Sequence, residues 1–495
     1  MSVPAETVVA DTESGGERGE RPVRAALRVL LASTSGRLGV ALFLVIVAVS
    51  LWVVATYPAG FGANLWSNPT VWANNPKTVP PAWTAWFGDG VEQQIFAATE
   101  PTSVEQRGAA EVRSSRFTVV APGASSPTFL ALTLPGINYH GRPPVVIATL
   151  VRPDGGEVRL ASHQVSPPRS GEVAPYQRYY DSPERILLDE QAATQESVAQ
   201  VYAALYPDLP GADRVTTNPA AALFGRPAAD GSGRIAPLAG DYVVTVQVLV
   251  ADPTDLVAGV DLIAGGTVFG IMGTDSLGRD LWRGLLYGFP VGLVIALVTS
   301  VLSTLIGTAL GILSGYAGGI TDLVIQRAVD IISNVPTLPL LIFIVFLFGS
   351  HLWLMLIVLV AFSWPGLTIV VRSMVLQVRS GQLVEAAQAL GASRWRVMAR
   401  HIFPQVAPFI VAQMIFSAPG AILAEASLSF LGLGDPTIPT WGQMLETGFR
   451  TGALYAGYWW WVIPPGLFLV FTAIVFMLVA LGMEAVVDPR LRRQR

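Results

Sequence analysis

Long apolar stretches without charge constrain this chain more than any other feature of its sequence. The first runs from Leu38 to about Tyr57, and about 20 apolar residues suffice to cross the hydrocarbon core of a bilayer. Later stretches predict helices at about 288–316, 333–348 and 353–371, between Arg400 and Glu425, and between Arg450 and Glu484. Apolar residues make up 52% of the chain and charged residues only 13%, well below the charge of an ordinary soluble domain. The sequence therefore predicts an all-α polytopic membrane protein with six transmembrane helices.

The segments outside these stretches differ in character. Residues 1–36 are polar and of mixed charge, which predicts a disordered tail before a first transmembrane helix at 37–57. A cleaved signal peptide is the alternative for that helix, although its n-region would be unusually long and acidic. Residues 58–270 lack a long apolar run, so we expect a large, mainly β insertion between helices 1 and 2, with a sandwich as the expected architecture. A five-helix domain is expected over 271–495. Within the insertion, turn signals bound strand-like runs at Arg116–Val120, Thr128–Leu134, Pro144–Val151 and Tyr242–Val250, and helical periodicity marks Asp189–Tyr206.

The placement of arginine predicts how the helices are oriented. Cytoplasmic loops of membrane proteins carry an excess of Lys and Arg. If the N-terminus is cytoplasmic, only Arg283 and Arg450 lie at outer helix ends from the second span onward. The arginines that then fall inside are Arg327, Arg372, Arg379, Arg394, Arg396, Arg400, Arg490, Arg492, Arg493 and Arg495. We therefore expect both termini in the cytoplasm and the insertion on the extracytoplasmic side.

The composition argues against several functional classes. The chain has no cysteine, and its four histidines lie far apart without the spacing of metal ligands. Lys77 is the only lysine and lies outside any glycine-rich loop, so the chain lacks the P-loop of an ATPase. The insertion has no Gly-x-Ser-x-Gly element of a serine hydrolase. A net charge of −4 gives no sign of a nucleic-acid partner.

Residues 382–404, between two predicted membrane helices, are the most informative segment. Leu383, Ala386, Ala387 and Leu390 recur at helical spacing and predict one apolar face. Gly391 suits the left-handed conformation that ends a helix. The small alanines would let a groove of another protein approach closely.

A second short, basic helix is expected after this glycine. Ser393 can cap it, it carries Arg394, Arg396 and Arg400, and Pro404 suits the first turn of the following span. From these residues alone, docking to a partner protein and contact with anionic lipid are equally open interpretations.

Four other groups of residues carry local predictions. Asp280 can cap the turn that follows it, Gly278 permits a tight bend, and Arg279 can pair with Asp275 or Asp280, which favours a scaffolding role for this block over solute contact. Glu425 is ionisable at membrane depth and is a functional candidate on that ground, although it can instead hold the following loop. We also expect an Arg327–Asp330 ion pair and an interfacial belt made of Trp441, Trp459, Trp460 and Trp461.

Four blocks in order resemble permease subunits of ATP-binding-cassette importers. The block Glu385, Ala386, Ala387, Gly391, Arg400, His401, Ile402 and Pro404 is similar to the cytoplasmic coupling ("EAA") loop of those permeases. The other blocks resemble the C-type subunit of dipeptide, oligopeptide and nickel importers. They comprise Gly273, Thr274, Asp275, Gly278, Arg279 and Asp280, the run Ile422–Gly434 with Glu425, and Asp488, Pro489 and Arg490. Phe403 and Gln405 stand where Leu and Asn are usual, and the insertion is much longer than in that subgroup.

The resemblance implies a transport subunit that is not an enzyme. Such a permease forms half of a translocation pathway in a prokaryotic plasma membrane, beside a second, different permease subunit. Two cytoplasmic ATPase subunits would hold ATP and Mg²⁺, and an extracytoplasmic protein would deliver the solute. Peptides are the implied solute, with nickel and oligosaccharides as alternatives. A different class, a membrane-anchored extracytoplasmic sensor or binding protein, stays open. A third class, a membrane-bound enzyme with its active site in the insertion, is disfavoured because the insertion has no recognisable catalytic or metal-binding group of residues.

Overall fold

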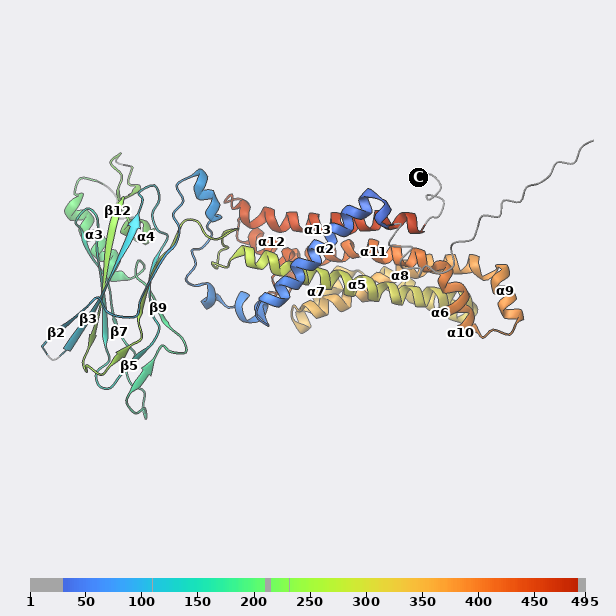
Figure 1. Ribbon diagram of the computed structural model, residues 1–495, viewed down its shortest axis with the longest axis horizontal. Helices are drawn as coiled ribbons and strands as arrows, with labels where there is room; N and C mark the ends of the chain where they lie inside the picture. The colour runs from blue at the N-terminus through green and yellow to red at the C-terminus, as the bar shows by residue number, and fades with distance from the viewer. Residues whose placement is uncertain (1–29, 109, 210–214, 231, 488–495) are drawn as a thin grey trace, which may run out of the picture.

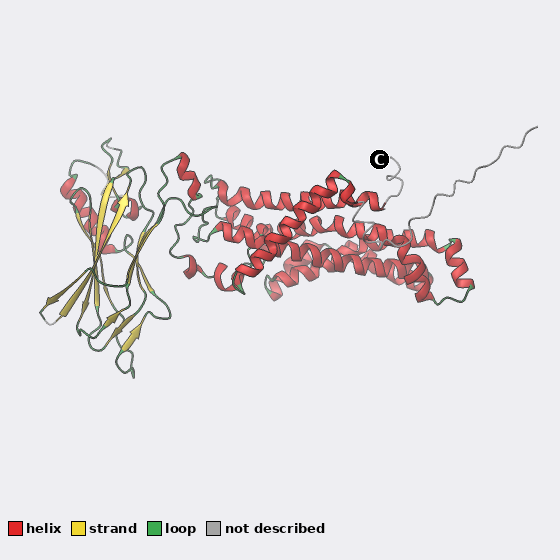
Figure 2. Ribbon diagram, viewed as in Figure 1, coloured by secondary structure: helices red, strands yellow, loops and turns green. Residues whose placement is uncertain are grey.

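The chain divides into a helical bundle and a β domain that lie at opposite ends of an elongated molecule (Figure 1). The computed structural model describes residues 30–108, 110–209, 215–230 and 232–487. Helices make up the whole bundle and strands dominate the other end (Figure 2). The predicted tail falls outside the described residues, except for its last positions, 30–36. The motif residues Asp488, Pro489 and Arg490 also fall outside them.

The bundle is made of the predicted apolar helices, with altered boundaries. Its long elements are α2 (Thr34–Thr56), α5 (Leu281–Ala317), α6 (Gly319–Asn334), α7 (Thr337–Phe348), α8 (Leu352–Arg379), α11 (Phe403–Leu428), α12 (Trp441–Arg450) and α13 (Trp459–Val487). Five helices in the described part of the chain are long and apolar enough to cross a membrane, or up to six if each bent pair counts as one span. The six-span arrangement therefore stays a prediction.

The third predicted span differs most from expectation. Instead of one helix at 333–348, α6 and α7 meet at a bend of 78°. Pro336 lies at the break, where it cannot donate a backbone hydrogen bond and disfavours a helical residue before it. α7 has 12 residues, so at 1.5 Å per residue it reaches only about 18 Å, short of the roughly 30 Å hydrocarbon core.

Glycines on α5 bring it into close contact with α8. A Cβ on Gly311 would come within 2.7 Å of the Val371 Cβ, and one on Gly315 within 2.8 Å of the Val375 Cβ. A Cβ on Gly307 would come within 2.9 Å of the Trp364 carbonyl oxygen. Small residues at this four-residue spacing let two membrane helices approach closely. The α5–α8 pair is therefore the tightly packed centre of the bundle.

The β domain is a sandwich with one shared core. One sheet has the order β2 (Ser103–Arg107), β3 (Ala110–Ala121), β12 (Gly240–Val250), β6 (Val145–Val151) and β7 (Glu157–Gln164). The facing sheet has the order β1 (Gln94–Ala98), β14 (Val260–Ala264), β4 (Leu130–Leu134) and β9 (Glu184–Leu187). Buried apolar residues of both sheets form a single cluster, and alternate residues of β12 point into it, from Tyr242 to Val250. The four predicted strands and the predicted helix, here α3 (Ala192–Leu205), are all present.

Smaller elements complete the domain and connect it to the bundle. Two further sheets are β13 (Leu256–Val257), β5 (Ile137–Tyr139) and β8 (Tyr176–Arg178), and β10 (Gly225–Pro227) with β11 (Ile235–Pro237); a short helix, α4, covers Pro219–Leu223. The connection from α2 contains three short helical turns, η1 (Phe61–Trp66), η2 (Pro69–Trp72) and η3 (Ala82–Phe87). The return connection, residues 265–280, leads directly into α5.

Candidate functional site

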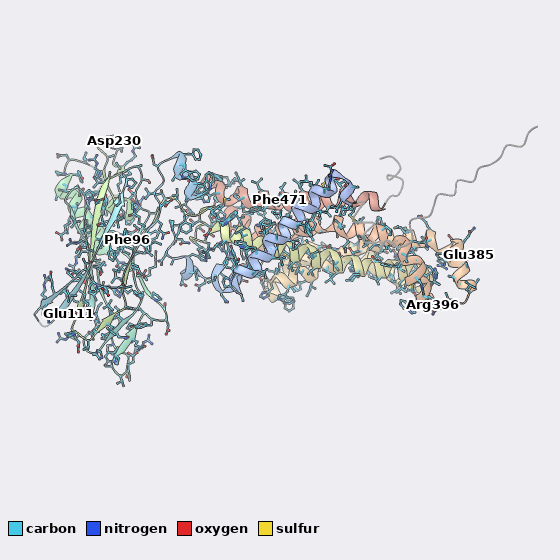
Figure 3. The ribbon with its side chains drawn as sticks, in the orientation of Figure 1. Phe96, Glu111, Asp230, Glu385, Arg396 and Phe471 are labelled. Carbon is cyan, nitrogen blue, oxygen red and sulfur yellow. The ribbon has the colours of Figure 1, made fainter. Side chains whose placement is uncertain are left out.

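The segment 382–404 forms a lever at the end of the bundle farthest from the β domain. It consists of α9 (Gln382–Ala389), α10 (Arg394–Val397) and η5 (Met398–Ile402), which leads into α11. Glu385 on α9 and Arg396 on α10 lie at this tip (Figure 3). We call residues 382–404 the lever below.

Gly391 ends α9 in the way the sequence predicted. Its φ is +78°, a left-handed value that side chains with a Cβ adopt at a cost. Gly391 N donates to the Gln388 carbonyl at 2.9 Å, and Ala392 N donates to the Ala387 carbonyl at 3.0 Å. These two bonds define a Schellman motif, which satisfies carbonyls at the helix end and reverses the chain. The turn fixes the angle between the two lever helices.

The predicted apolar face of α9 is divided between the body and the solvent side. Val384 and Ala387 are buried, with exposed fractions of 1% and 7%, and pack with Val371, Val375 and Ile312. Leu383 and Leu390 are 58% and 88% exposed, and Ala386 is also exposed. The prediction of one apolar face is thus wrong: the first group anchors the lever, and the second forms an outer apolar surface.

The second half of the lever adds positive charge to this outer surface. Ser393 caps α10 by accepting a hydrogen bond from Arg396 N, as predicted. Arg394, Arg396 and Arg400 are exposed, as is Trp395 at 74%. Val397, Met398 and Ile402 are buried and hold this half against the bundle.

The remaining motif residues of the lever occupy its edges. Glu385 is exposed on α9, and His401 is half-buried, with its carbonyl accepting a 2.7 Å hydrogen bond from Gln405 Nε2. Pro404 lies in the first turn of α11, where a missing N–H costs little. Exposed apolar residues on α9 and exposed arginines on the second half of the lever together suit contact with another macromolecule.

A polar network that was not predicted from the sequence lies at the base of the lever. Arg372 on α8 donates two hydrogen bonds of 2.6 Å to the two carboxylate oxygens of Asp322 on α6. Ser314 on α5 donates to the same carboxylate. A bidentate pair is directional as well as strong, so it locks three helices where the lever begins. Asp322 and Arg372 are 50 residues apart in the sequence. The only sequence signal of their pairing is that each is a single charge next to a long apolar run.

The block 273–280 is a self-contained turn at the other end of α5. Asp280 caps α5 by accepting from Trp282 N at 3.0 Å, and Gly278 has a φ of +77°. Asp275 is fully buried and pairs with Arg279 at 2.5 Å. Of the two predicted partners of Arg279, Asp275 and Asp280, the structure therefore has Asp275. Gly273 also has positive φ, +72°.

This turn holds together three parts of the chain. Thr274 Oγ1 donates to the Pro76 carbonyl at 2.7 Å, and Trp460 Nε1 donates to the Thr274 carbonyl at 3.3 Å. The Arg279 guanidinium lies 4.3 Å from the centroid of the Trp66 ring. The block therefore joins the connection from α2, the start of α5 and the start of α13, in line with the scaffolding role that the sequence favoured.

The other predicted residues have structural partners. Glu425 is 3% exposed on α11 and accepts a 2.6 Å hydrogen bond from Ser429, and the exposed Arg327–Asp330 pair forms at 3.3 Å. The tryptophan belt is wrong for three of its members: Trp441, Trp460 and Trp461 are buried in the bundle core, because their large rings fill space between packed helices.

A polar hollow that opens on the surface of the bundle was not predicted. It has a volume of about 250 Å³ and lies between α5, α8 and α11. Its polar lining comprises Ser303, Thr304, Ser363, Gln413 and Ser417. Polar groups at membrane depth are expensive unless they face a cavity or a partner, so this hollow is the place in the bundle best suited to a polar solute.

The fold and the apolar helices define a multi-pass helical membrane protein with a β domain inserted after its first long apolar helix. Residues 307–493 match the family described as "Binding-protein-dependent transport system inner membrane component". The dipeptide transport system permease protein DppC of Bacillus subtilis is 33% identical over 222 residues, which cover 45% of this chain and 69% of that protein. A probable peptide ABC transporter permease protein of Sinorhizobium fredii is 37% identical over 45% of this chain and 76% of its own length. The chain belongs to this family of transport permeases.

One solved structure that resembles the chain is the inward-facing MetNI methionine ABC transporter. It is 20% identical, covers 42% of this chain and 94% of its own, and has a TM-score of 0.33. The β domain, residues 94–264, lies outside the family match. The family match thus covers most of the bundle and does not include the β domain.

Proposed function

We propose that this protein is the permease subunit of an ATP-driven peptide importer and forms half of its translocation pathway. The relatives named above are a dipeptide permease and a probable peptide permease, which supports peptides over nickel or oligosaccharides. The chain itself performs no chemistry in this proposal. ATP and Mg²⁺ reside on two cytoplasmic ATPase subunits, and a second permease subunit supplies the other half of the pathway.

The observation that carries the proposal is the division of the lever into a buried and an exposed face. Val384, Ala387 and Ile402 tie it to α5 and α8, so a push on the lever moves those helices. Leu383, Leu390 and Trp395 stay uncovered in this chain, although contiguous exposed apolar groups are a mark of an interaction site. An ATPase subunit that covers them can transmit its closure to the bundle.

The same two helices border the polar hollow lined by Ser303 and Ser363. Movement of the α5–α8 pair relative to α11 therefore changes the shape of the proposed solute path. Transport requires two conformations whose balance both ATP and solute bias, and this geometry connects the two sites through packed helices.

The orientation is also part of the proposal. We place the lever and both termini in the cytoplasm and the β domain outside the plasma membrane of a prokaryote, where it can meet a solute-binding protein. The lever and the β domain lie at opposite ends of the bundle (Figure 1), which supports opposite sides of one membrane.

Cysteine labelling tests the orientation cleanly, because the chain has no natural cysteine. Leu256→Cys in the β domain and Leu390→Cys in the lever are both at highly exposed positions. A membrane-impermeant maleimide added to intact cells or spheroplasts should label only the former, and both after lysis. Labelling of Leu390→Cys before lysis contradicts the proposed orientation.

A second experiment tests the docking surface. Glu385→Arg combined with Ala386→Trp places charge and bulk on the exposed face of α9. The double variant should insert normally but lose copurification with the ATPase subunits. Ala387→Trp is a poorer probe, because Ala387 faces the bundle and its substitution would damage the lever itself.

A further inference from the structure

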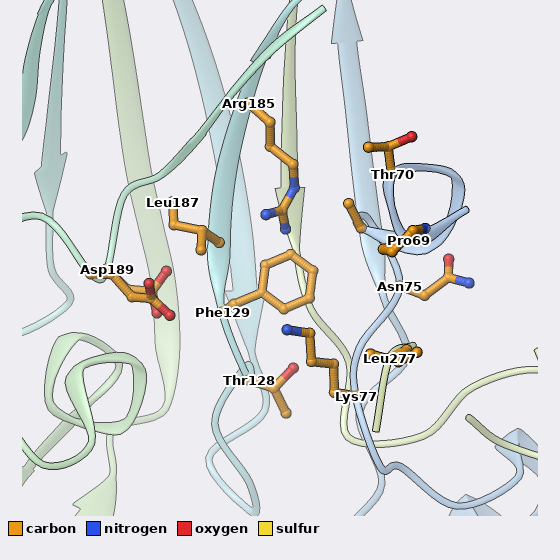
Figure 4. Close-up of a pocket in the computed structure, with 12 residues that line it drawn as sticks. Pro69, Thr70, Asn75, Lys77, Thr128, Phe129, Arg185, Leu187, Asp189 and Leu277 are labelled. Atoms are coloured by element: carbon orange, nitrogen blue, oxygen red, sulfur yellow. The ribbon is translucent and has the colours of Figure 1, made fainter. Parts of the chain in front are cut away.

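A cavity of about 450 Å³ lies at the junction between the β domain and the bundle. Pro69, Asn75 and Lys77 of the connection from α2 form one wall, and Phe129 and Arg185 of the β4–β9 region form another (Figure 4). Leu277, from the turn that precedes α5, closes the cavity toward the bundle. Sites for small molecules in proteins occupy about 300–1,000 Å³, so a short peptide is of suitable size.

Two cations face this cavity without a carboxylate of their own. The Arg185 guanidinium and the Lys77 ammonium approach the Phe129 ring from opposite sides (Figure 4). Arg185 Nε donates to Asn74 Oδ1 at 2.9 Å, and its guanidinium lies 5.4 Å from the centroid of the Phe129 ring. Neither cation forms an ion pair within the described part of the chain. Burial lowers the pKa of Arg185, so a bound carboxylate would relieve a desolvated charge.

Two carboxylates line the same cavity. Asp189 is 4% exposed and accepts a 2.9 Å hydrogen bond from Leu130 N, whereas Glu190 is exposed. Both act electrostatically on Arg185 and oppose the lowering of its pKa, but neither forms an ion pair with it among the described residues. Two cations and two carboxylates therefore line one cavity without forming ion pairs with one another among the described residues.

We propose that this cavity binds a short peptide through its two free termini. The peptide carboxylate pairs with the Arg185 guanidinium beside the Phe129 ring, and the peptide ammonium group lies at Asp189 and Glu190. An apolar side chain of the peptide packs on Phe129. This proposal takes its solute class from the proposed transport function, and it gives the β domain a role: it retains solute next to the start of α5.

The direct test is peptide binding to the full-length protein alone, in lipid nanodiscs without ATPase or solute-binding protein. The probe is alanyl-phenylalanine, measured by calorimetry. Saturable binding that falls at least tenfold in Arg185→Gln is expected. Arg107→Gln, an exposed arginine on strand β2, is the matched control and should bind as the unaltered protein does. No saturable binding, or equal affinity in all variants, overturns the proposal.

The two ends of the peptide can be tested separately. Glu190 is exposed, so Glu190→Gln should fold normally and weaken alanyl-phenylalanine binding. N-acetyl-alanyl-phenylalanine lacks the ammonium group, so its weaker binding should be unaffected by Glu190→Gln but still sensitive to Arg185→Gln. Equal effects of Glu190→Gln on both peptides contradict the assigned direction.

Uptake by the assembled importer separates this site from the proposed function. If the importer transports peptides but the isolated chain binds none, the cavity proposal fails and the transport function stands. If the chain binds the peptide through Arg185 but the importer does not transport peptides, the transport function fails and the site stands. If Arg185→Gln impairs only docking of the solute-binding protein, the cavity holds a segment of that protein and the peptide proposal is overturned.

Discussion

Gly391→Val tests the lever through backbone strain alone. Gly391 has a φ of +78°, and a Cβ built there meets no atom within 4 Å. The substitution therefore causes no clash and costs only the strain of a left-handed β-branched residue, about 1–3 kcal/mol. Since α9 has 8 residues and such short helices are marginal by themselves, this cost falls on the ordered lever. At about 1.4 kcal/mol per tenfold, the ordered lever should lose roughly 5- to 150-fold in relative population.

The assay is ATPase activity and peptide uptake by the reconstituted importer, with hydrogen exchange of residues 382–392 as a structural readout. Gly391→Val should lose uptake and exchange faster in the lever, while Gly391→Asn, which tolerates the left-handed region, should lose less. Gly452→Val is a matched control, because Gly452 has a φ of +77° and also has no atom within 4 Å of a built Cβ. Full uptake and unchanged exchange in Gly391→Val would refute the reasoning.

Three further predictions concern the β domain and the turn at 273–280. Residues 94–264 expressed alone should be soluble and unfold cooperatively in urea, because their core is shared between two sheets; a gradual, non-cooperative loss of structure would contradict this. Burial raises the pKa of Asp189 to about 6, so its contribution to stability falls as pH rises from about 4 through 6, by about 3 kcal/mol. Asp189→Asn should flatten this part of the urea-derived stability profile, and an unchanged slope would show that Asp189 titrates normally. Arg279→Leu leaves the buried Asp275 carboxylate without its ion pair and should lower full-length yield and melting temperature, as breaking a buried pair costs about 3–5 kcal/mol; a melting temperature equal to that of the unaltered protein would show that the pair is not needed.

Deleting the β domain, residues 94–264, while keeping the connection from α2 and the turn at 273–280 tests the role of the domain in transport. Uptake should fall more than basal ATPase activity, because solute delivery is affected and the lever is not. Normal uptake at limiting peptide would leave the domain without a transport role.

Sequence patterns predicted the parts of the fold that depend on local chemistry. Apolar runs located most of the long helices, turn signals located four strands, and Gly391 and Ser393 marked the lever joint. These features succeed because a left-handed glycine or a helix cap depends only on neighbouring residues.

Features that depend on distant contacts were missed. Nothing local shows that Ala387 faces the bundle and Leu390 does not, because that choice depends on where α5 and α8 pass. The Asp322–Arg372 pair joins two helices, and the cavity at Arg185 combines strands with a loop about 110 residues earlier. The bend between α6 and α7 was overlooked, although Pro336 was a visible signal.

The central claim is that the lever is the contact for an ATPase subunit, and crosslinking from Leu390→Cys tests it most directly. The natural chain has no cysteine, and position 390 is 88% exposed, so a maleimide–benzophenone reagent attaches at one defined site and, on illumination, inserts into a C–H bond of the protein next to it. In membranes containing the whole importer, we expect a crosslink from Leu390→Cys to an ATPase subunit that varies with bound nucleotide, and none from Leu256→Cys. Failure of Leu390→Cys to crosslink to the ATPase, in an importer that still transports, would contradict docking of the ATPase at the lever.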